Sequence, residues 1–191
     1  MIERMTRRGF ARVMVGAGVA AAAGPALASE EVATSGSTAL RRISGLRAQD
    51  WREHFPSLGK GAILAVIDDR VLHFWAEDGF YRIYPTSVPL SEEMTRKGRT
   101  EIVMKRPAPD WSPTPSMIER NPDLPRYVGP GPENPLGVRA MNLSWQYYVI
   151  HGTNDIRKIG RQSSSGCIGL HNEHVIEIYD RAKVGTQVLV V

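Results

Sequence analysis

Cysteine is nearly absent from this sequence: Cys167 is the only one among 191 residues, which excludes an internal disulfide. After residue 28 the sequence also lacks an apolar run long enough to span a bilayer, an internal repeat, and a basic motif with interleaved aromatic residues. The formal charge is +4, but the first 28 residues contribute +3 of it, so the remainder is close to neutral. These absences argue against a disulfide-rich scaffold, a repeat protein and a nucleic-acid-binding module.

The N-terminal segment has the three parts of an export signal. Residues 6–10 (TRRGF) form a twin-arginine pattern, residues 13–23 are apolar and small, and residues 26–28 (ALA) resemble a cleavage site. We therefore expect residues 1–28 to direct export by the twin-arginine route, leaving the rest in the periplasm or cell envelope with no stable membrane span. The alternative is an N-terminal membrane anchor, for which the apolar run is short.

The rest of the chain is long enough for one domain with a hydrophobic core. Its small, polar residues 29–38 predict a flexible leader, and residues 40–55 predict short helical turns that end before Pro56. We therefore divide the chain into a signal peptide at 1–28, a leader with a short helical segment at 29–60, and one domain at 61–191.

Short apolar runs separated by turn residues predict a mainly β domain, a sandwich or flattened barrel, with a few short helices. The expected strands cover residues 62–67, 71–75, 80–88, 100–105, 147–150 and 187–191. One helix is expected from residue 173 to about residue 183, with Asn172 as its N-cap.

Residues 106–140 hold nine of the thirteen prolines and show little periodic pattern. A structureless stretch of this length is uncommon inside a compact domain and is usually functional or disordered. Large apolar residues are nevertheless spaced along it, namely Trp111, Met117, Ile118, Leu124 and Tyr127. We expect this long Pro-rich loop to pack on the domain, cover the site and help to hold a substrate. The alternative is a solvated linker, but few residues follow for a second core.

Cys167 is the candidate nucleophile. A lone thiol in an oxidising compartment is a liability unless it has a function, although an inert buried cysteine is the plain alternative. Fifteen residues separate it from His151, which could accept the thiol proton and later return it to a leaving amine. No Asp or Asn is an obvious partner for the imidazole, so we expect a backbone carbonyl to orient it.

Small residues precede the cysteine, in the order Ser164, Ser165 and Gly166. They would let backbone N–H groups turn toward a developing oxyanion, and the amides of Gly166 and Cys167 are the natural donors. A zinc site is the competing interpretation, because Cys167, His171 and His174 have ligand spacing and His151 could complete a tetrahedron. We favour the free thiol.

Residues 151–153 (HGT) and 164–168 (SSGCI) resemble the signature of the L,D-transpeptidase (YkuD-type) catalytic domain family. That signature is a His-Gly pair at a strand end followed by Ser-x-Gly-Cys. The resemblance covers about residues 61–191, and it includes residues 111–115 (WSPTP) and 130–137, which look like the connecting segment of many members. It implies an L,D-transpeptidase-like fold.

The resemblance also implies an activity, the modification of peptidoglycan, which serves cell-wall biogenesis and cell shape. Cys167 would attack the carbonyl between the third and fourth residues of a peptidoglycan stem, D-Ala would leave, and an amine would resolve the thioester. The amine would belong to a second stem, giving a crosslink between third residues, or to an envelope protein. No metal or organic cofactor is implied. Beside Cys167 and His151, the implied site includes Ser165 and Gly166, with Trp111, Gly152, Thr153, Ser164 and Gly169 binding substrate.

Two alternatives to the transpeptidase remain open. With water as the acceptor, the same thioester would make the protein an L,D-carboxypeptidase or endopeptidase. The third possibility is an inactive wall-binding relative, and the retention of both Cys167 and His151 argues against it.

The sequence departs from the family pattern in ways that bear on the pocket. Gly169 stands where the family usually has Arg, Ser165 where many members have His, and residues 95–98 read TRKG in place of Thr-Pro-Thr-Gly. We expect Gly169 to alter the choice of donor or acceptor while thioester chemistry survives. The alternative is that Arg139, Arg157 or Arg161 fills the vacated space.

Overall fold

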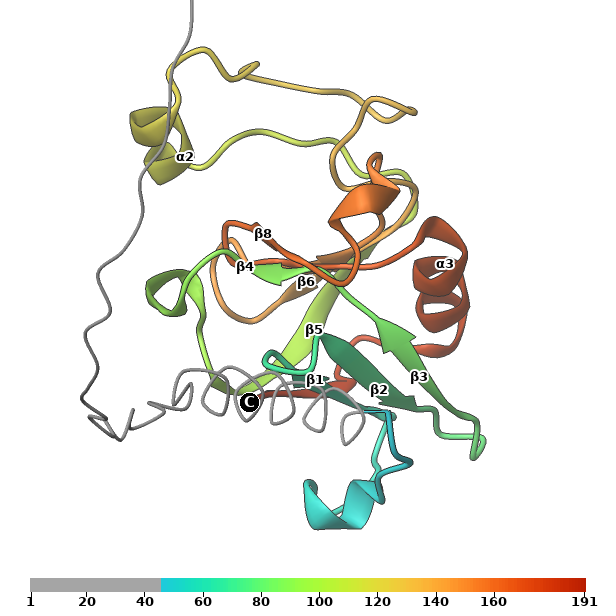
Figure 1. Ribbon diagram of the computed structural model, residues 1–191. Coiled ribbons are helices and arrows are strands. Elements are labelled where there is room, and N and C mark those ends of the chain that lie inside the picture. The colour runs from blue at the N-terminus through green and yellow to red at the C-terminus, as the bar shows by residue number, and fades with distance from the viewer. Residues whose placement is uncertain (1–45) are drawn as a thin grey trace, which may run out of the picture.

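The computed structural model describes residues 46–191, so the expected signal peptide at 1–28 and the leader up to residue 45 lie outside the described residues. The described part is mainly β, as the sequence predicts, with a few short helices (Figure 1). Its strands are β1 (Ala62–Val66), β2 (Val71–Trp75), β3 (Tyr81–Pro85), β4 (Val88–Pro89), β5 (Gly98–Arg106), β6 (Ala140–Leu143), β7 (Val149–His151), β8 (Gln162–Ser164), β9 (Ile168–Gly169) and β10 (Gln187–Val190). Its helical elements are η1 (Trp51–Glu53), η2 (Glu92–Met94), α2 (Pro115–Arg120), η3 (Ile156–Lys158) and α3 (Asn172–Arg181).

The main sheet is curled and contains eight strands in the order β3-β2-β1-β10-β5-β6-β7-β9. Strands β1, β2 and β3 form an antiparallel meander, as their apolar runs and intervening turn residues predict. The C-terminal strand β10 joins the two halves of the sheet, because it pairs in parallel with β1 and antiparallel with β5. Strands β4 and β8 form a separate parallel pair. Sequence-distant strands thus build the part of the sheet that carries Cys167 and His151.

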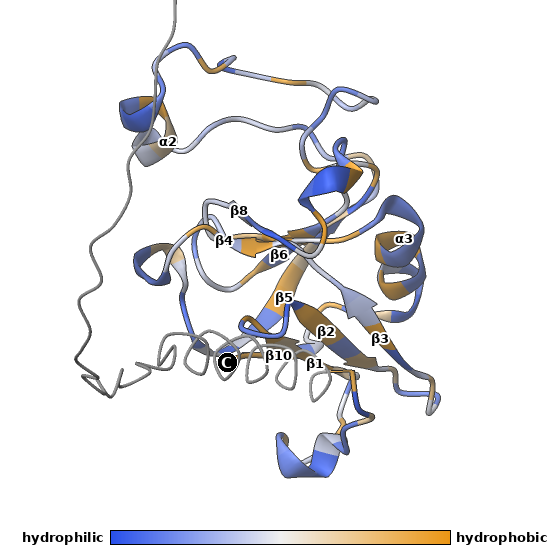
Figure 2. Cartoon of the chain, in the orientation of Figure 1, coloured by the Kyte–Doolittle hydropathy of each residue, from blue (hydrophilic) through white to orange (hydrophobic). Residues whose placement is uncertain are grey.

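The main core lies between the concave face of the sheet and α3. Figure 2 shows the apolar residues gathered on the strands and on the side of α3 that faces them. From α3, the side chains of Val175 and Ile178 are fully buried in this core. A smaller cluster on the other face contains Phe55 and Trp75, which the segment around η1 covers. The sheet is therefore held on both faces where it passes through β1 and β2.

The start of α3 differs from the prediction. Asn172 is the first residue of the helix, and His171 occupies the cap position without making a side-chain cap hydrogen bond. The Asn172 side chain bonds to the backbone of Thr153 instead. An Asn beside a helix start indicates a cap by default, and here a tertiary contact overrides that preference.

Three short strands were not predicted, namely β6, β8 and β9. The last two consist mainly of small or polar residues, which give no alternation to read. The expected strand at 80–88 is divided, because the chain leaves the main sheet after Pro85 and Ser87 bridges to Gly169. None of the helices in residues 46–191 is long and apolar enough to cross a membrane.

The Pro-rich segment 107–139 forms an arch that runs out from the end of β5, turns at α2 and returns to β6 (Figure 1). Trp111 and Val128 pair through their backbones, which closes the arch on itself. The buried side chain of Asn134 donates to the carbonyls of Pro109, Val128 and Gly129. The segment is thus ordered by polar contacts and prolines.

Candidate active site

Cys167 and His151 line one cleft of about 630 Å³. His151 is the last residue of β7, and Cys167 immediately precedes β9. The two strands are parallel neighbours, with Ile150 opposite Ile168 and His151 opposite Gly169. This register places the two residues, which fifteen residues separate in the sequence, on neighbouring strands at one edge of the sheet, with Cys167 level with Val149 and His151 two positions further along.

The imidazole of His151 is held by a backbone carbonyl, the kind of partner that we expected. Nδ1 lies 2.5 Å from the carbonyl oxygen of Gly152, which can only accept, so Nδ1 carries the proton and Nε2 presents a lone pair. Burial is the main reason that the pKa of His151 falls from 6.5 to about 4; the Gly152 hydrogen bond opposes this shift, and the nearby cations Lys158 and Arg106 contribute to it. The imidazole is therefore neutral at pH 7 and able to accept a proton.

The thiol of Cys167 is free and half-buried. Its Sγ donates to the carbonyl of Tyr147 at 3.4 Å. Burial raises the pKa of the thiol from 9.0 to about 11, although a hydrogen bond from the Val149 backbone and the charge of Arg106 act in the opposite direction. At pH 7 the resting pair is therefore a neutral thiol beside a neutral imidazole.

Tyr147 has a backbone conformation that is uncommon for an aromatic residue. Its φ is 68°, in the left-handed region, where it forms part of the turn between β6 and β7. This conformation explains why the strand expected from residue 147 begins only at Val149. In this conformation the Tyr147 carbonyl oxygen lies against the thiol of Cys167.

Asn172 fixes the segment that follows His151. Its Oδ1 accepts from the backbone N–H of Thr153 at 3.1 Å, and its Nδ2 donates to the Thr153 carbonyl at 3.0 Å. A Cβ at Gly152 would lie 2.2 Å from that Oδ1, so only glycine fits there. Gly152 is not among the residues that line the cleft, and its observed contribution is the carbonyl that orients His151.

The loop before Cys167 is a tight turn closed by side-chain oxygens. Ser164 Oγ donates to the Cys167 carbonyl at 2.6 Å and accepts from the Gly166 amide at 3.4 Å. Gly166 has φ 125°, a conformation that disfavours any residue with a Cβ. Ser165 points to the arch, where Arg120 Nη2 donates to its Oγ at 3.1 Å. The loop thus connects the cysteine to the Pro-rich segment.

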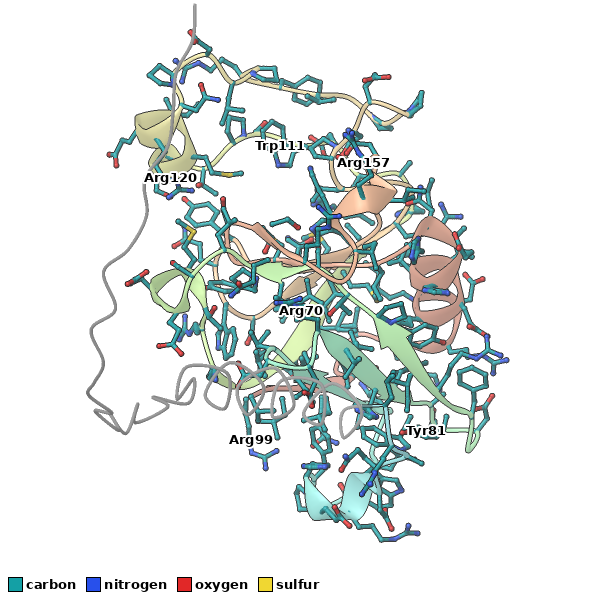
Figure 3. The ribbon with its side chains drawn as sticks, in the orientation of Figure 1. Arg70, Tyr81, Arg99, Trp111, Arg120 and Arg157 are labelled. Atoms are coloured by element: carbon teal, nitrogen blue, oxygen red, sulfur yellow. The ribbon has the colours of Figure 1, made fainter. Side chains whose placement is uncertain are left out.

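The arch contributes to the cleft as its apolar residues predict. Figure 3 shows Trp111 on the arch, with Arg120 extending from α2. Of the site residues expected from the sequence, six line the cleft, namely Trp111, His151, Thr153, Ser164, Ser165 and Cys167. Gly152, Gly166 and Gly169 do not. Residues outside the site expected from the sequence also line it, among them Ser87, Arg106, Tyr147 and Lys158.

Gly169 lies against Ser87 and His151. Its backbone N–H and carbonyl both bond to the backbone of Ser87, and an added Cβ would lie 2.3 Å from Ser87 Oγ and 3.7 Å from His151 Cε1. The side chain of Ser87 therefore occupies the space that a residue larger than glycine would need. None of the arginines that the alternative interpretation offered as compensation, Arg139, Arg157 and Arg161, lines the cleft.

The histidines considered as zinc ligands have other neighbours. The rings of His171 and His174 lie 5.2 Å apart in an edge-on arrangement, and His174 also contacts Tyr84. Within residues 46–191, no group of three or more His, Cys, Asp or Glu side chains converges as a metal site would require.

The sequence model of the YkuD family, described as the L,D-transpeptidase catalytic domain, matches residues 60–190. The chain belongs to the L,D-transpeptidase catalytic domain family. A putative L,D-transpeptidase of Fuscovulum blasticum, from the ATP synthase subunits region, is 50% identical over 94% of this chain and 96% of its own length. The probable L,D-transpeptidase ErfK/SrfK of Escherichia coli is 32% identical over 69% of this chain but only 44% of its own length.

Solved structures of the family share the fold. L,D-transpeptidase 3 from Mycobacterium tuberculosis superposes with a TM-score of 0.58 at 16% identity, over 69% of this chain and 61% of that one. An L,D-transpeptidase from Stackebrandtia nassauensis gives a TM-score of 0.55 at 14% identity, over 82% and 67% of the two chains. The expected L,D-transpeptidase-like fold is thereby confirmed.

Proposed function

We propose that this protein is a peptidoglycan-modifying L,D-transpeptidase that uses Cys167 as its nucleophile and His151 as its general base. It cleaves a stem peptide before the terminal D-Ala and transfers the acyl group to an amine. The observation that carries the proposal is the joint placement of the only cysteine and a carbonyl-oriented imidazole in one cleft. Family membership supplies the substrate class.

The neutral state of the pair determines how the thiol reacts. When a stem carbonyl approaches, His151 Nε2 accepts the Sγ proton as the carbon–sulfur bond forms. The backbone amide of Cys167, which lines the cleft, then stabilises the oxyanion. The Gly166 amide, the other expected donor, bonds to Ser164 Oγ in the structure. The tetrahedral intermediate collapses, the carbon–nitrogen bond breaks, and the imidazolium gives its proton to the departing D-Ala amine. A thioester and a neutral imidazole remain.

An acceptor amine completes the cycle. It attacks the thioester carbonyl, His151 removes a proton from it, and the sulfur leaves and regains that proton as the product amide forms. The acceptor that we propose is the side-chain amine of a second stem or an amine of an envelope protein. Water in the same position would release a tripeptide stem.

The test is incubation of the purified protein with muropeptides, followed by mass spectrometry of the products. Loss of D-Ala together with formation of stem dimers is expected from the natural protein, and neither from Cys167→Ser, the matched control. Tripeptide stems without dimers would identify a carboxypeptidase. Equal products from Cys167→Ser would remove the cysteine from the mechanism.

We also propose that residues 1–28 are a twin-arginine signal and that the enzyme acts in the periplasm or cell envelope. The TRRGF and ALA segments support this. N-terminal sequencing of protein from the envelope fraction should begin at Ser29. An uncleaved N-terminus on cytosolic protein would contradict the proposal.

A further inference from the structure

Two half-buried cations line the cleft beside the thiol and the imidazole. Arg106 is the last residue of β5 and Lys158 the last of η3, and they are the only Lys or Arg residues among those of the described chain that line the cleft. They reach it from segments that are 52 positions apart in the sequence. No sequence motif indicates this pairing, and neither residue belongs to the expected site.

The guanidinium of Arg106 is held in a fixed orientation. Its Nε donates to Asn142 Oδ1 at 3.1 Å, and its Nη1 donates to the carbonyl and to Oδ1 of Asp110 at 3.0 and 3.1 Å. The remaining Nη2 makes no hydrogen bond within residues 46–191. An oriented guanidinium with a spare N–H group suits the recognition of a carboxylate, because little side-chain freedom is left to lose.

The charge felt by the reacting groups is positive. Lys158 and Arg106 both lower the pKa of His151, and Arg106 lowers that of Cys167. Asp110 and Glu133 also line the cleft, but no carboxylate contributes to either shift. Both cations therefore act on the reacting atoms, although Asp110 partly neutralises Arg106 through its ion pair with Nη1.

We propose that Arg106, assisted by Lys158, binds the free C-terminal carboxylate of the donor stem peptide. This inference rests on the proposed function, in which the leaving group is a single amino acid. Its carboxylate follows the scissile carbonyl by one residue, at most about 3.6 Å of chain, and so must lie in the same cleft. The position two residues after the cysteine supplies no cation, because it is Gly169. Arg106 and Lys158 supply that charge from two other segments.

The first experiment measures the subsite with two thiol reagents that differ in one charge. Iodoacetate carries a carboxylate and iodoacetamide does not, and both alkylate the same sulfur, so the ratio of their rates cancels any change in the pKa of Cys167. Arg106→Gln should lower the iodoacetate-to-iodoacetamide ratio about tenfold, the effect of losing one charge-assisted hydrogen bond. Lys158→Gln should lower it less, and Arg106→Lys should restore part of it.

Two control variants test whether Arg106 binds the carboxylate, only braces the arch, or only adds to the general positive charge around the thiol. Asp110→Asn weakens the same link between Arg106 and the arch but keeps the cation, so it should preserve or raise the ratio. Arg157→Gln removes the neighbouring cation, which pairs with Asp155 outside the cleft, and should leave the ratio unchanged. An unchanged ratio in Arg106→Gln, or an equal fall in Asp110→Asn or in Arg157→Gln, would overturn the proposal.

The second experiment compares stem tetrapeptide donors that end in a carboxylate or a carboxamide. The natural protein should prefer the carboxylate through a lower KM, and Arg106→Gln should remove that preference. Equal use of both donors would overturn the subsite while the transpeptidase function stood. If neither donor gave product, the proposed function would fail, and the alkylation ratio would still decide whether the carboxylate subsite exists.

Discussion

The β1–β2 hairpin and the Pro-rich arch at 107–139 are built on opposite principles. Every residue of β2 is buried, and so are four of the five in β1. In the arch, α2 has no buried residue, and order comes from the backbone pairing of Trp111 with Val128 and from the amide of Asn134. The hairpin is therefore stabilised by burial, and the arch by a few directed polar contacts.

This difference assigns the two regions different roles. Removing apolar volume from the hairpin should affect folding and leave chemistry intact in the molecules that fold. Changing the arch should affect substrate handling and leave stability intact, because little apolar surface is lost. Cys167 and His151 lie where the regions meet, since β7 and β9 extend the sheet and the arch lines their cleft.

The largest expected effect is at that junction. His151→Gln should lower the rate of thioester formation about a thousandfold or more, because the imidazole is the proposed acceptor of the thiol proton. The fold should be kept, since neither the sheet nor the arch depends on the ring. Single-turnover mass spectrometry of the acyl-enzyme measures the rate, and circular dichroism checks the fold. A rate within tenfold of the natural protein would exclude His151 as the base.

A matched pair of variants separates the hairpin from the arch. Leu72→Ala should cost about 2–5 kcal/mol of unfolding free energy, since Leu72 is fully buried, with kcat/KM unchanged for the folded fraction. Trp111→Ala should cost about 1 kcal/mol or less but raise KM severalfold, because the side chain lines the cleft. Urea unfolding and steady-state kinetics on both variants provide the measurements. Reversed outcomes would show that the arch is part of the stability core.

Acid should destabilise the junction in a defined range of pH. The pKa of His151 is about 4 when folded and 6.5 ordinarily, so between these values the unfolded chain binds a proton that the native state does not. The stability from this group is complete above pH 6.5 and is lost as the pH falls toward 4, by roughly 3 kcal/mol. Urea unfolding at pH 7.5 and pH 4 should show this loss, and His151→Gln should reduce it. Equal pH dependence in the two proteins would contradict the lowered pKa.

The sequence predicted the locally determined hairpin better than the strands and cleft residues that depend on distant segments. The hairpin was predictable because the apolar runs 62–67 and 71–75 and the turn residues between them determine it locally. The polar strands β8 and β9 are set by pairing with distant strands, so no local pattern marks them. At the site, the lone cysteine and the His-Gly pair predicted that Cys167 and His151 act together, and both line one cleft. Arg106 and Lys158 were not found, because a basic residue at the end of a strand or turn looks the same whether it faces solvent or a cleft.

Asn172 shows why the sequence indicated the reactive residues more readily than the residues that position them. Its position before an apolar helical pattern predicted a cap, whereas the side chain holds the Thr153 backbone and restricts Gly152 to glycine. That contact joins residues nineteen positions apart. Only the tertiary fold, which sets the start of α3 beside the segment after β7, brings them together, so the local pattern could not reveal it.

The smallest expected effect concerns the contact that joins the arch to the nucleophile loop. Arg120 Nη2 donates to Ser165 Oγ in an exposed position, and α2 has no buried residue to hold it otherwise. An exposed polar contact contributes about 1 kcal/mol or less. Arg120→Ala should therefore leave the melting temperature nearly unchanged. It should raise KM for a stem peptide about two- to fivefold, because a looser arch binds an extended substrate less well.

A small reagent distinguishes a loosened arch from a damaged site. Iodoacetamide needs no contact with the arch, so its rate with Cys167 should be the same in Arg120→Ala as in the natural protein. Arg126→Ala, an exposed arginine in the same segment, is the matched control and should change neither value. If iodoacetamide reacts faster with Arg120→Ala, the contact shields the thiol and α2 acts as a cover. An unchanged KM would mean that the rest of the arch positions the substrate without this contact.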